Sequence, residues 1–341
     1  MTARLFAGAL VLAAALPGGV HQDRAPAAPS GQTARDPSEL WYVHGSLRAK
    51  SGHQFAFSAA FRRIELAKGN GRISGRSRWR ARAMISAGIE LADLTGHRLW
   101  HAERVERVAL DPAGSARNEQ NVTAGDWSLA GLPSRHALGS EIRLRSATPQ
   151  FAVNVVNVPA NRGDRPSSRG ALVARGSIAI DGLRFSVAGD AWLEHRFSTT
   201  DESNKRWETF ALELADGREV NLRVTPDERG RTAQVSGTLI ERSGAVIRLN
   251  HDDAGVGEWA HTHWRSPHTG ISYPSLWIVA IPRAKLSLTV SPVVGDQEVV
   301  PDADGRPYWG GPVDITDNTQ RSGSTTIGGG WATLAGFGGV R

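Results

Sequence analysis

The chain has 341 residues, with 40 lysines and arginines against 34 aspartates and glutamates, and it contains no cysteine. The lack of cysteine excludes disulfides, thiolate nucleophiles and thiolate metal sites. The net charge of +6 does not indicate a nucleic-acid partner, because the arginines are spread along the chain among acidic residues. No stretch reaches the roughly 18 consecutive apolar residues of a membrane helix, so we expect no stable membrane span.

The first residues have the pattern of a secretory signal peptide, which we place at residues 1–20. An n-region with Arg4 precedes an apolar run from Leu5 to Leu16, and a Pro-Gly-Gly sequence follows. The next segment, residues 21–37, is rich in alanine, proline and polar residues, so we expect a disordered leader. The mature protein is therefore expected in the periplasm or outside the cell.

Alternation of apolar and polar residues predicts short antiparallel β-strands along most of the chain. Alternating stretches flank Asp181-Gly182, Asp216-Gly217 and Ser243-Gly244, which are residue pairs typical of hairpin turns. The longer periodicity of amphipathic helices is absent, and 38 glycines and 17 prolines supply turns throughout. We therefore expect an all-β protein.

Two similar segments predict a division into two β-barrels. Trp41 begins one predicted hairpin, and Trp207 begins another about half a mature chain later. A small barrel has room inside for side chains or one small ligand, and a tryptophan at the start of a hairpin can plug its end. We expect an N-terminal barrel at residues 38–198 and a C-terminal barrel at residues 207–341, joined by the charged linker 199–206.

The sequence AWLEHRF, at residues 191–197, contains the first candidate for chemistry. On a strand, His195 lies on the same face as Phe197 and on the opposite face from Glu194, so the two neighbours do not form a simple acid–base pair. In an apolar pocket, burial favours the neutral imidazole, which can act as a general base. The other interpretation is a core histidine that only satisfies its own hydrogen bonds.

Seven motifs occur in the order, and with the approximate spacing, of a known family. They are ELWYVHGSL...FAFSAAFRR, LADLTGHRLWHAERVER, DWSL, AWLEHRF, RWETFALELADGRE, WRSPHTGISYPSLWIV and YWGGPVDI. Across residues 38–340 the chain thus resembles the lipocalin-like family of AttH-type predicted secreted hydrolases and carotenoid 1,2-hydratases (CrtC-type hydroxyneurosporene synthases). The resemblance implies two tandem lipocalin-like (calycin) antiparallel β-barrels, in agreement with the division above.

The resemblance also implies site residues. The family closes its first barrel with a Trp-x-Asp-His-x-Trp pattern, which here reads WLEHRF. His195 matches the histidine implicated in the hydratases, whereas Glu194 and Phe197 stand in place of the aspartate and a pocket tryptophan. The Tyr-Asp pair of the hydratases falls near Leu222 and Arg223, so the carboxylate that protonates an alkene is missing, which argues against carotenoid hydration.

The segment EWAHTHWRSPH, at residues 258–268, contains three histidines whose spacing is adequate for a metal site. The family motif in this segment rests instead on tryptophan, serine, proline, glycine and tyrosine. We therefore expect no metal site and no other cofactor.

These patterns predict an exported protein that binds a hydrophobic small molecule such as a lipid, isoprenoid or polyketide. As an enzyme of the hydrolase or hydratase type, it would use His195 as general base, with Glu194 beside it. The residues expected to contact the ligand are Trp41, Tyr42, Arg62, Trp192, Phe197, Trp207 and Trp309. The alternative is a non-catalytic periplasmic lipocalin-type binding component of an ABC-type transport system, in which His195 has no chemical role.

Overall fold

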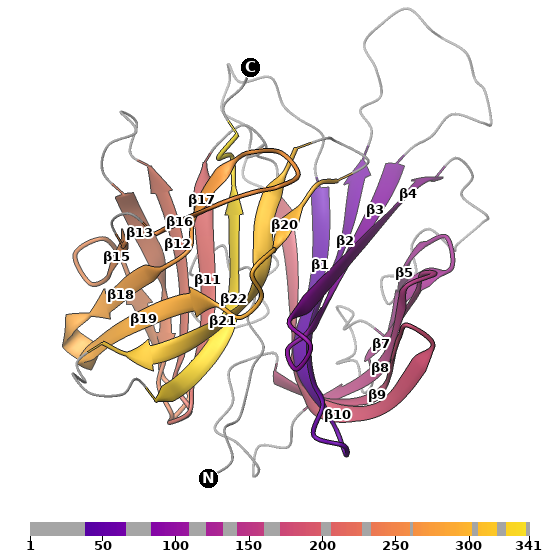
Figure 1. Ribbon diagram of the computed structural model, residues 1–341, viewed down its shortest axis with the longest axis horizontal. Coiled ribbons are helices and arrows are strands. Elements are labelled where there is room, and N and C mark those ends of the chain that lie inside the picture. The colour runs from indigo at the N-terminus through magenta and orange to yellow at the C-terminus, as the bar shows by residue number, and fades with distance from the viewer. Residues whose placement is uncertain are drawn as a thin grey trace, which may run out of the picture.

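The structure is a computed structural model of the chain (Figure 1). It describes residues 38–65, 83–108, 121–131, 142–159, 171–198, 206–226, 233–259, 262–301, 306–318 and 325–338, with the side chains of residues 38, 65, 158, 159, 171, 194–198 and 233 left out. The predicted signal peptide, the predicted leader and residues 199–205 of the predicted linker lie outside the described residues.

The first sheet is antiparallel and has ten strands. They are β1 (Ser38–Ala49), β2 (Gln54–Glu65), β3 (Ala83–Asp93), β4 (Arg98–Val108), β5 (Asn121–Ala124), β6 (Trp127–Ala130), β7 (Ile142–Ala147), β8 (Phe151–Pro159), β9 (Ala171–Ile180) and β10 (Leu183–Ser198). Their order is β4-β3-β2-β1-β10-β9-β8-β7-β6-β5. Because β5 also contacts β3 and β4, the sheet curls into a barrel.

The second sheet repeats this arrangement. Its path contains β11 (Trp207–Leu214), β12 (Glu219–Pro226), β13 (Ala233–Ile240), β14 (Val246–Leu249), β15 (Gly255–Glu258), β18 (Trp277–Ile281), β19 (Leu286–Pro292), β21 (Tyr308–Asp317) and β22 (Thr326–Ala335). Their order is β14-β13-β12-β11-β22-β21-β19-β18-β15, and β20 (Glu298–Val299) pairs with β21. A separate hairpin consists of β16 (His263–Arg265) and β17 (Ser272–Pro274), and the 3-10 helix η2 (Pro282–Ala284) lies between β18 and β19. The predicted all-β architecture of two tandem barrels is confirmed.

The predicted hairpin turns are also found in the structure. Asp181 and Gly182 join β9 to β10 with φ angles of 48° and 79°. Two consecutive positive φ angles match the right-handed twist of paired strands, and glycine and aspartate tolerate them better than other residues. Gly217 and Gly244 likewise have positive φ angles in the turns that follow β11 and β13.

Buried tryptophans lie in both barrel cores, but only one of the two tryptophans that were predicted to plug a barrel is among them. Trp41 is buried in the N-terminal core, as expected for a plug. In the C-terminal barrel this role belongs to Trp277 and Trp309, whose ring centroids are 5.7 Å apart inside the core. Trp207 is instead half-buried outside that core, with the guanidinium of Arg223 5.1 Å from its ring.

The two barrels pack side by side, outer face against outer face (Figure 1). Trp331 of β22 is buried against Ala56 and Ala92 of the N-terminal barrel. Tyr42 of β1 packs against Ala211 of β11. A face of β1–β3 that would otherwise meet solvent is thus covered by the second barrel.

In the described part of the chain, no helix is long and apolar enough to cross a membrane.

Candidate functional site between the barrels

A row of side chains crosses the outer face of the N-terminal barrel beneath the C-terminal barrel. Cross-strand partners join Trp192 to His44, His44 to Ser58, Ser58 to Glu90 and Glu90 to His101. Residues directly opposite in antiparallel strands point to the same face of the sheet, so these five side chains form one line from β10 to β4. We call this line the polar row.

Glu90 is the central acid of the polar row, with a relative exposure of 7%. Tyr308, from the other barrel, donates a hydrogen bond to Glu90 Oε1 at 2.5 Å. Burial raises the pKa of the Glu90 carboxyl, and this outweighs the opposing effects of His101 and of hydrogen bonds from Tyr308 and Ser58. A buried carboxyl of this kind keeps its proton to higher pH than an exposed one, so it can act as an acid.

His44 forms an aromatic wall beside Glu90. Its ring stacks on Trp192, with centroids 5.6 Å apart and planes 8° apart, and lies 5.3 Å from the ring of Tyr42. Burial lowers the pKa of His44 to about 3, so the imidazole is neutral at pH 7. Among the described residues, no group hydrogen-bonds to its Nδ1 atom. A neutral, buried and unpartnered nitrogen can bond a ligand or a water molecule.

Small residues leave room next to the polar row. The neighbouring row joins Tyr42 to Ala60, Ala60 to Gly88 and Gly88 to Glu103. A Cβ atom added to Gly88 would meet no heavy atom within 4 Å. Open space therefore lies over Gly88, two residues before Glu90 on β3 and on the same face of the strand.

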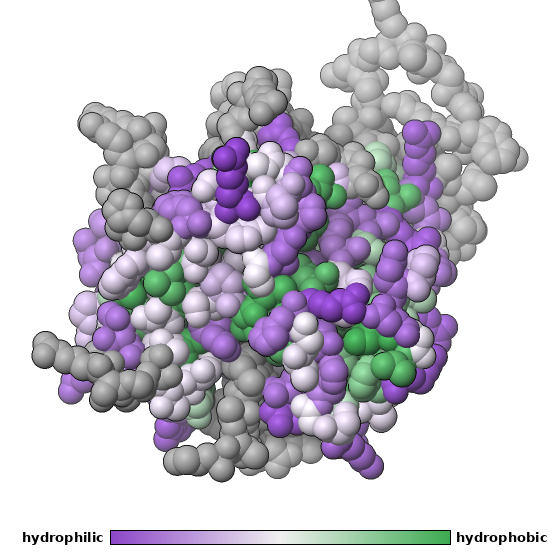
Figure 2. Space-filling model, viewed as in Figure 1, coloured by the Kyte–Doolittle hydropathy of each residue, from purple (hydrophilic) through white to green (hydrophobic). Residues whose placement is uncertain are grey.

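This space is close to the surface of the molecule. The side chains of His101 and Glu103 have relative exposures of 19% and 20%, and Arg62, in the next row, is exposed. Figure 2 shows hydrophobic residues reaching the surface near the middle of the view, where the barrels meet. We call the whole group the interbarrel site, which consists of Tyr42, His44, Ser58, Gly88, Glu90, His101, Glu103, Trp192 and Tyr308.

The C-terminal barrel turns further polar groups toward the N-terminal barrel. Thr209 lies on the same face of β11 as Ala211, which contacts Tyr42. The buried Oγ1 atom of Thr209 has no hydrogen-bond partner among the described residues. Arg223 pairs with Thr209 across β11 and β12 and is buried. The resemblance places the carboxylate of the hydratases near this position. Here the buried residue is a cation, Arg223, instead of an acid.

The structure brings only part of the predicted ligand-binding set together. Tyr42 and Trp192 belong to the interbarrel site, and Arg62 lies at its exposed edge. Trp41 and Trp309 lie in the two barrel cores, with relative exposures of 6% and 1%.

The predicted catalytic pair lies on β10. His195 is the Cα partner of Trp41, and Glu194 is the Cα partner of Tyr42. Phe197 pairs in the same ladder with Glu39. The side chains of these three β10 residues lie outside the described residues, so their roles remain predictions.

Sequence reasoning missed three main groups of the site: His44, Glu90 and Tyr308. His44 and Tyr308 fall inside the family motifs LWYVHGSL and YWGGPVDI, so the motifs could have indicated them. Glu90 stands at one of the polar positions of an alternating strand, and a charged residue at such a position ordinarily faces solvent. Only the packing of the second barrel shows that this face is buried.

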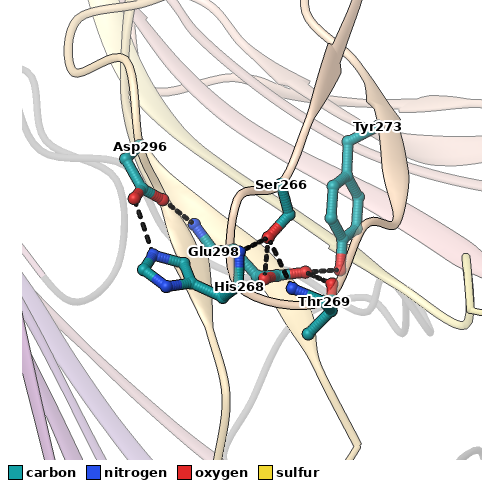
Figure 3. A network of polar contacts seen from close by, with 6 residues as sticks. All are labelled: Ser266, His268, Thr269, Tyr273, Asp296 and Glu298. Atoms are coloured by element: carbon teal, nitrogen blue, oxygen red, sulfur yellow. Dashed lines mark hydrogen bonds and ion pairs between the residues drawn. The ribbon is translucent and has the colours of Figure 1, made fainter.

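A second polar network, in the C-terminal barrel, holds the β16–β17 hairpin (Figure 3). The carboxyl group of Glu298 accepts hydrogen bonds from the hydroxyls of Ser266, Thr269 and Tyr273, at 2.6 Å for Thr269 and 2.9 Å for Tyr273. The Ser266 hydroxyl oxygen in turn accepts hydrogen bonds from the backbone N–H groups of His268 and Thr269. This network ties the hairpin to β20.

The network is not a hydrolase triad, although it contains serine, histidine and aspartate. His268 Nε2 bonds Asp296 at 2.7 Å, whereas Ser266 donates to Glu298 instead of to the imidazole. His261 of the considered metal site lies outside the described residues. Among those described, no group of three or more histidines, aspartates and glutamates could hold a metal ion.

Replacing Glu298 with alanine is expected to lower the free energy of unfolding by about 2 kcal/mol, because buried hydroxyl donors lose their acceptor. Urea unfolding, followed by tryptophan fluorescence, measures this loss. Asp296→Ala is the matched control, because the Asp296–His268 pair is about half exposed and should contribute less than about 1 kcal/mol. Equal losses in both variants would contradict the assignment.

Comparison with known proteins agrees with this architecture. The AttH-like family model matches residues 20–163 and 166–337. The chain is similar to an AttH protein from Nitrosomonas europaea, with 22% identity and a TM-score of 0.70 over 89% of this chain and 93% of that one. It is also similar to kievitone hydratase from Nectria haematococca, with 14% identity and a TM-score of 0.59 over 87% and 88% of the two chains. A comparison with curated proteins found no match.

Proposed function

Because the chain belongs to the AttH-like family, we propose that it is an exported enzyme of the hydratase or hydrolase type. It binds a hydrophobic small molecule, such as a lipid, isoprenoid or polyketide, between its two barrels. The observation that carries this proposal is a buried carboxyl group with a raised pKa, Glu90, next to open space at Gly88.

The surroundings of Glu90 suit a ligand that is largely apolar. Tyr42, His44 and Trp192 offer ring faces, and Ala60 and Gly88 leave room for the ligand. Sites for small molecules combine such apolar walls with a few polar groups that fix the orientation. Here the polar groups are Glu90, Tyr308 and the Nδ1 atom of His44.

The proposed chemistry is proton transfer from Glu90 to the bound molecule. In a hydration, the carboxyl proton goes to one carbon of a double bond, and water adds to the other carbon. The water then loses a proton, and Glu90 regains one, so the protein is unchanged. Glu90 thereby supplies the acid that the Leu222–Arg223 segment lacks.

The ladder between β1 and β10 separates the two predicted catalytic residues. Glu194 is the Cα partner of Tyr42, which belongs to the interbarrel site, whereas His195 is the Cα partner of Trp41, which lies in the core of the N-terminal barrel. A base that removes a proton from water complements an acid such as Glu90, because the two proton transfers need separate groups. The register favours Glu194 for this part in the interbarrel site, and the His195→Ala variant tests the predicted role of His195.

Mass spectrometry on lipid and isoprenoid extracts tests the function. The mature protein, His195→Ala and buffer are each incubated with the extract, and retained and altered compounds are identified. We expect a compound changed by the mass of one water, or cleaved at an ester, in the presence of the protein. Retention of an unaltered compound would instead indicate a carrier, such as a binding component of an ABC-type transport system.

A further inference from the structure

We infer that His101 and Glu103 form the path by which Glu90 exchanges protons with solvent. This inference rests on the proposed function, in which Glu90 loses and regains a proton in each cycle. A buried acid needs such a path, because water cannot reach it freely. The three groups lie next to one another on two adjacent strands, β3 and β4.

The geometry leads from the buried acid to the surface in two steps. His101 is the direct cross-strand partner of Glu90, and the two groups interact electrostatically. His101 Nε2 lies 3.5 Å from Glu103 Oε1. Both outer side chains retain about a fifth of their exposure, at 19% and 20%, compared with 7% for Glu90. The described chain thus connects one buried acid to two partly exposed titratable groups.

Two atoms of these side chains that have no hydrogen-bond partner support this role. His101 Nε2 and Glu103 Oε2 are buried and make no hydrogen bond to any described group. Buried polar atoms without a protein partner are ordinarily hydrogen-bonded to ordered water. Here they are free to bond water, and water completes proton paths between groups that are too far apart for direct transfer.

The other neighbours of Glu90 are less suited to carry its proton. Ser58 and Tyr42, which are hydrogen-bonded at 3.0 Å, are both buried. Burial, followed by the charge of Glu90, raises the pKa of the Tyr308 hydroxyl well above its ordinary value, so Tyr308 remains a neutral donor. Of the described groups that face Glu90 from β1, β2, β4 and β21, His101 and Glu103 combine an ionisable side chain with about a fifth of its surface exposed, at 19% and 20%.

The transfer conserves protons. His101 gives the proton on one ring nitrogen to the Glu90 carboxylate and takes another from water held by Glu103. The proton that water loses during hydration goes to the base and from there to solvent. Each cycle therefore moves one proton inward and one outward.

Infrared spectroscopy of the ligand-free protein tests the path without a substrate. The carbonyl band of protonated Glu90 is identified as the band lost in Glu90→Gln. After mixing with D₂O, its isotope shift reports the rate of proton exchange. We expect exchange in His101→Gln to be slower by about tenfold or more, with partial recovery on addition of free imidazole, and an intermediate rate in Glu103→Gln.

The exposed His251→Gln is the matched control and should exchange at the wild-type rate. Wild-type exchange in both His101→Gln and Glu103→Gln, with folding verified by circular dichroism, would overturn the inference. If Glu90→Gln also blocked turnover, the proposed function would stand without the path. If no band were lost in Glu90→Gln, Glu90 would be ionised, and both proposals would fail.

Discussion

Replacing Glu90 with glutamine is expected to lower turnover of the bound compound by about 10²- to 10⁴-fold, which is the usual contribution of a general acid. Glutamine has nearly the same shape and can still accept the hydrogen bond from Tyr308. It cannot release a proton to a substrate. Retention of the ligand should therefore change only a few-fold, and single-turnover mass spectrometry separates binding from conversion.

The control for this prediction is Asp252→Asn, which removes a carboxylate whose side chain is 81% exposed, far along the chain on the C-terminal barrel. It should leave both retention and conversion unchanged. Turnover by Glu90→Gln at the wild-type rate would show that Glu90 only joins the barrels. Loss of ligand retention in Glu90→Gln would show that the carboxyl group binds rather than reacts.

The second large effect concerns the stability of the C-terminal barrel and depends on Glu208. This buried carboxyl accepts hydrogen bonds from the indole of Trp277 at 3.1 Å and from Arg206 at 3.3 Å. Arg206 also pairs with Glu258 at 2.5 Å. Burial, and then the charge of Glu258, raises the pKa of Glu208 to about 7, although Arg206 acts in the opposite direction.

The raised pKa makes the folded barrel less stable in alkaline solution. The folded state holds the Glu208 proton more tightly than the unfolded chain, in which the pKa is near the ordinary value of 4.5. Its contribution to stability is therefore complete below pH 4.5 and is lost as the pH rises through about 7. A shift of this size corresponds to roughly 3 kcal/mol.

Glu208→Gln should remove most of this pH dependence. We expect the variant to unfold at higher urea concentration than the wild type at pH 8, and the difference to shrink or reverse at pH 4.5. Glu258→Gln should act in the same direction but more weakly, because it removes the neighbouring charge that raises the pKa of Glu208. Parallel stability curves for Glu208→Gln and wild type between pH 4.5 and 8 would contradict this account.

Local patterns in the sequence were sufficient to predict the strands and their turns. Asp181-Gly182 predicts a tight hairpin because its two positive φ angles suit few other residue pairs. The alternation within each strand shows which side chains share a face. It does not show what covers that face. For this reason Trp41 was correctly expected inside a barrel, whereas Trp207 was not found there.

The interbarrel site depends on contacts between residues that are far apart in the sequence. Glu90 and Tyr308 are separated by 218 residues, and the environment of each is created by the other barrel. Tyr42 was predicted only from its position in a family motif, and nothing in its neighbourhood indicated that it packs on Ala211. Burial, which raises the pKa of Glu90 and lowers that of His44, comes from the packing of the two sheets and could not be inferred from either sheet alone.

The central claim, that the ligand binds between the barrels, is tested most directly by filling the open space beside Glu90. Gly88→Leu adds a side chain where no heavy atom lies within 4 Å of the new Cβ, and Gly255→Leu makes the same change in equally open space on β15. Mass spectrometry then measures the compounds that each protein retains from the extract. We expect Gly88→Leu to be folded but to lose the ligand, while Gly255→Leu retains it; undiminished retention by Gly88→Leu would place the ligand elsewhere.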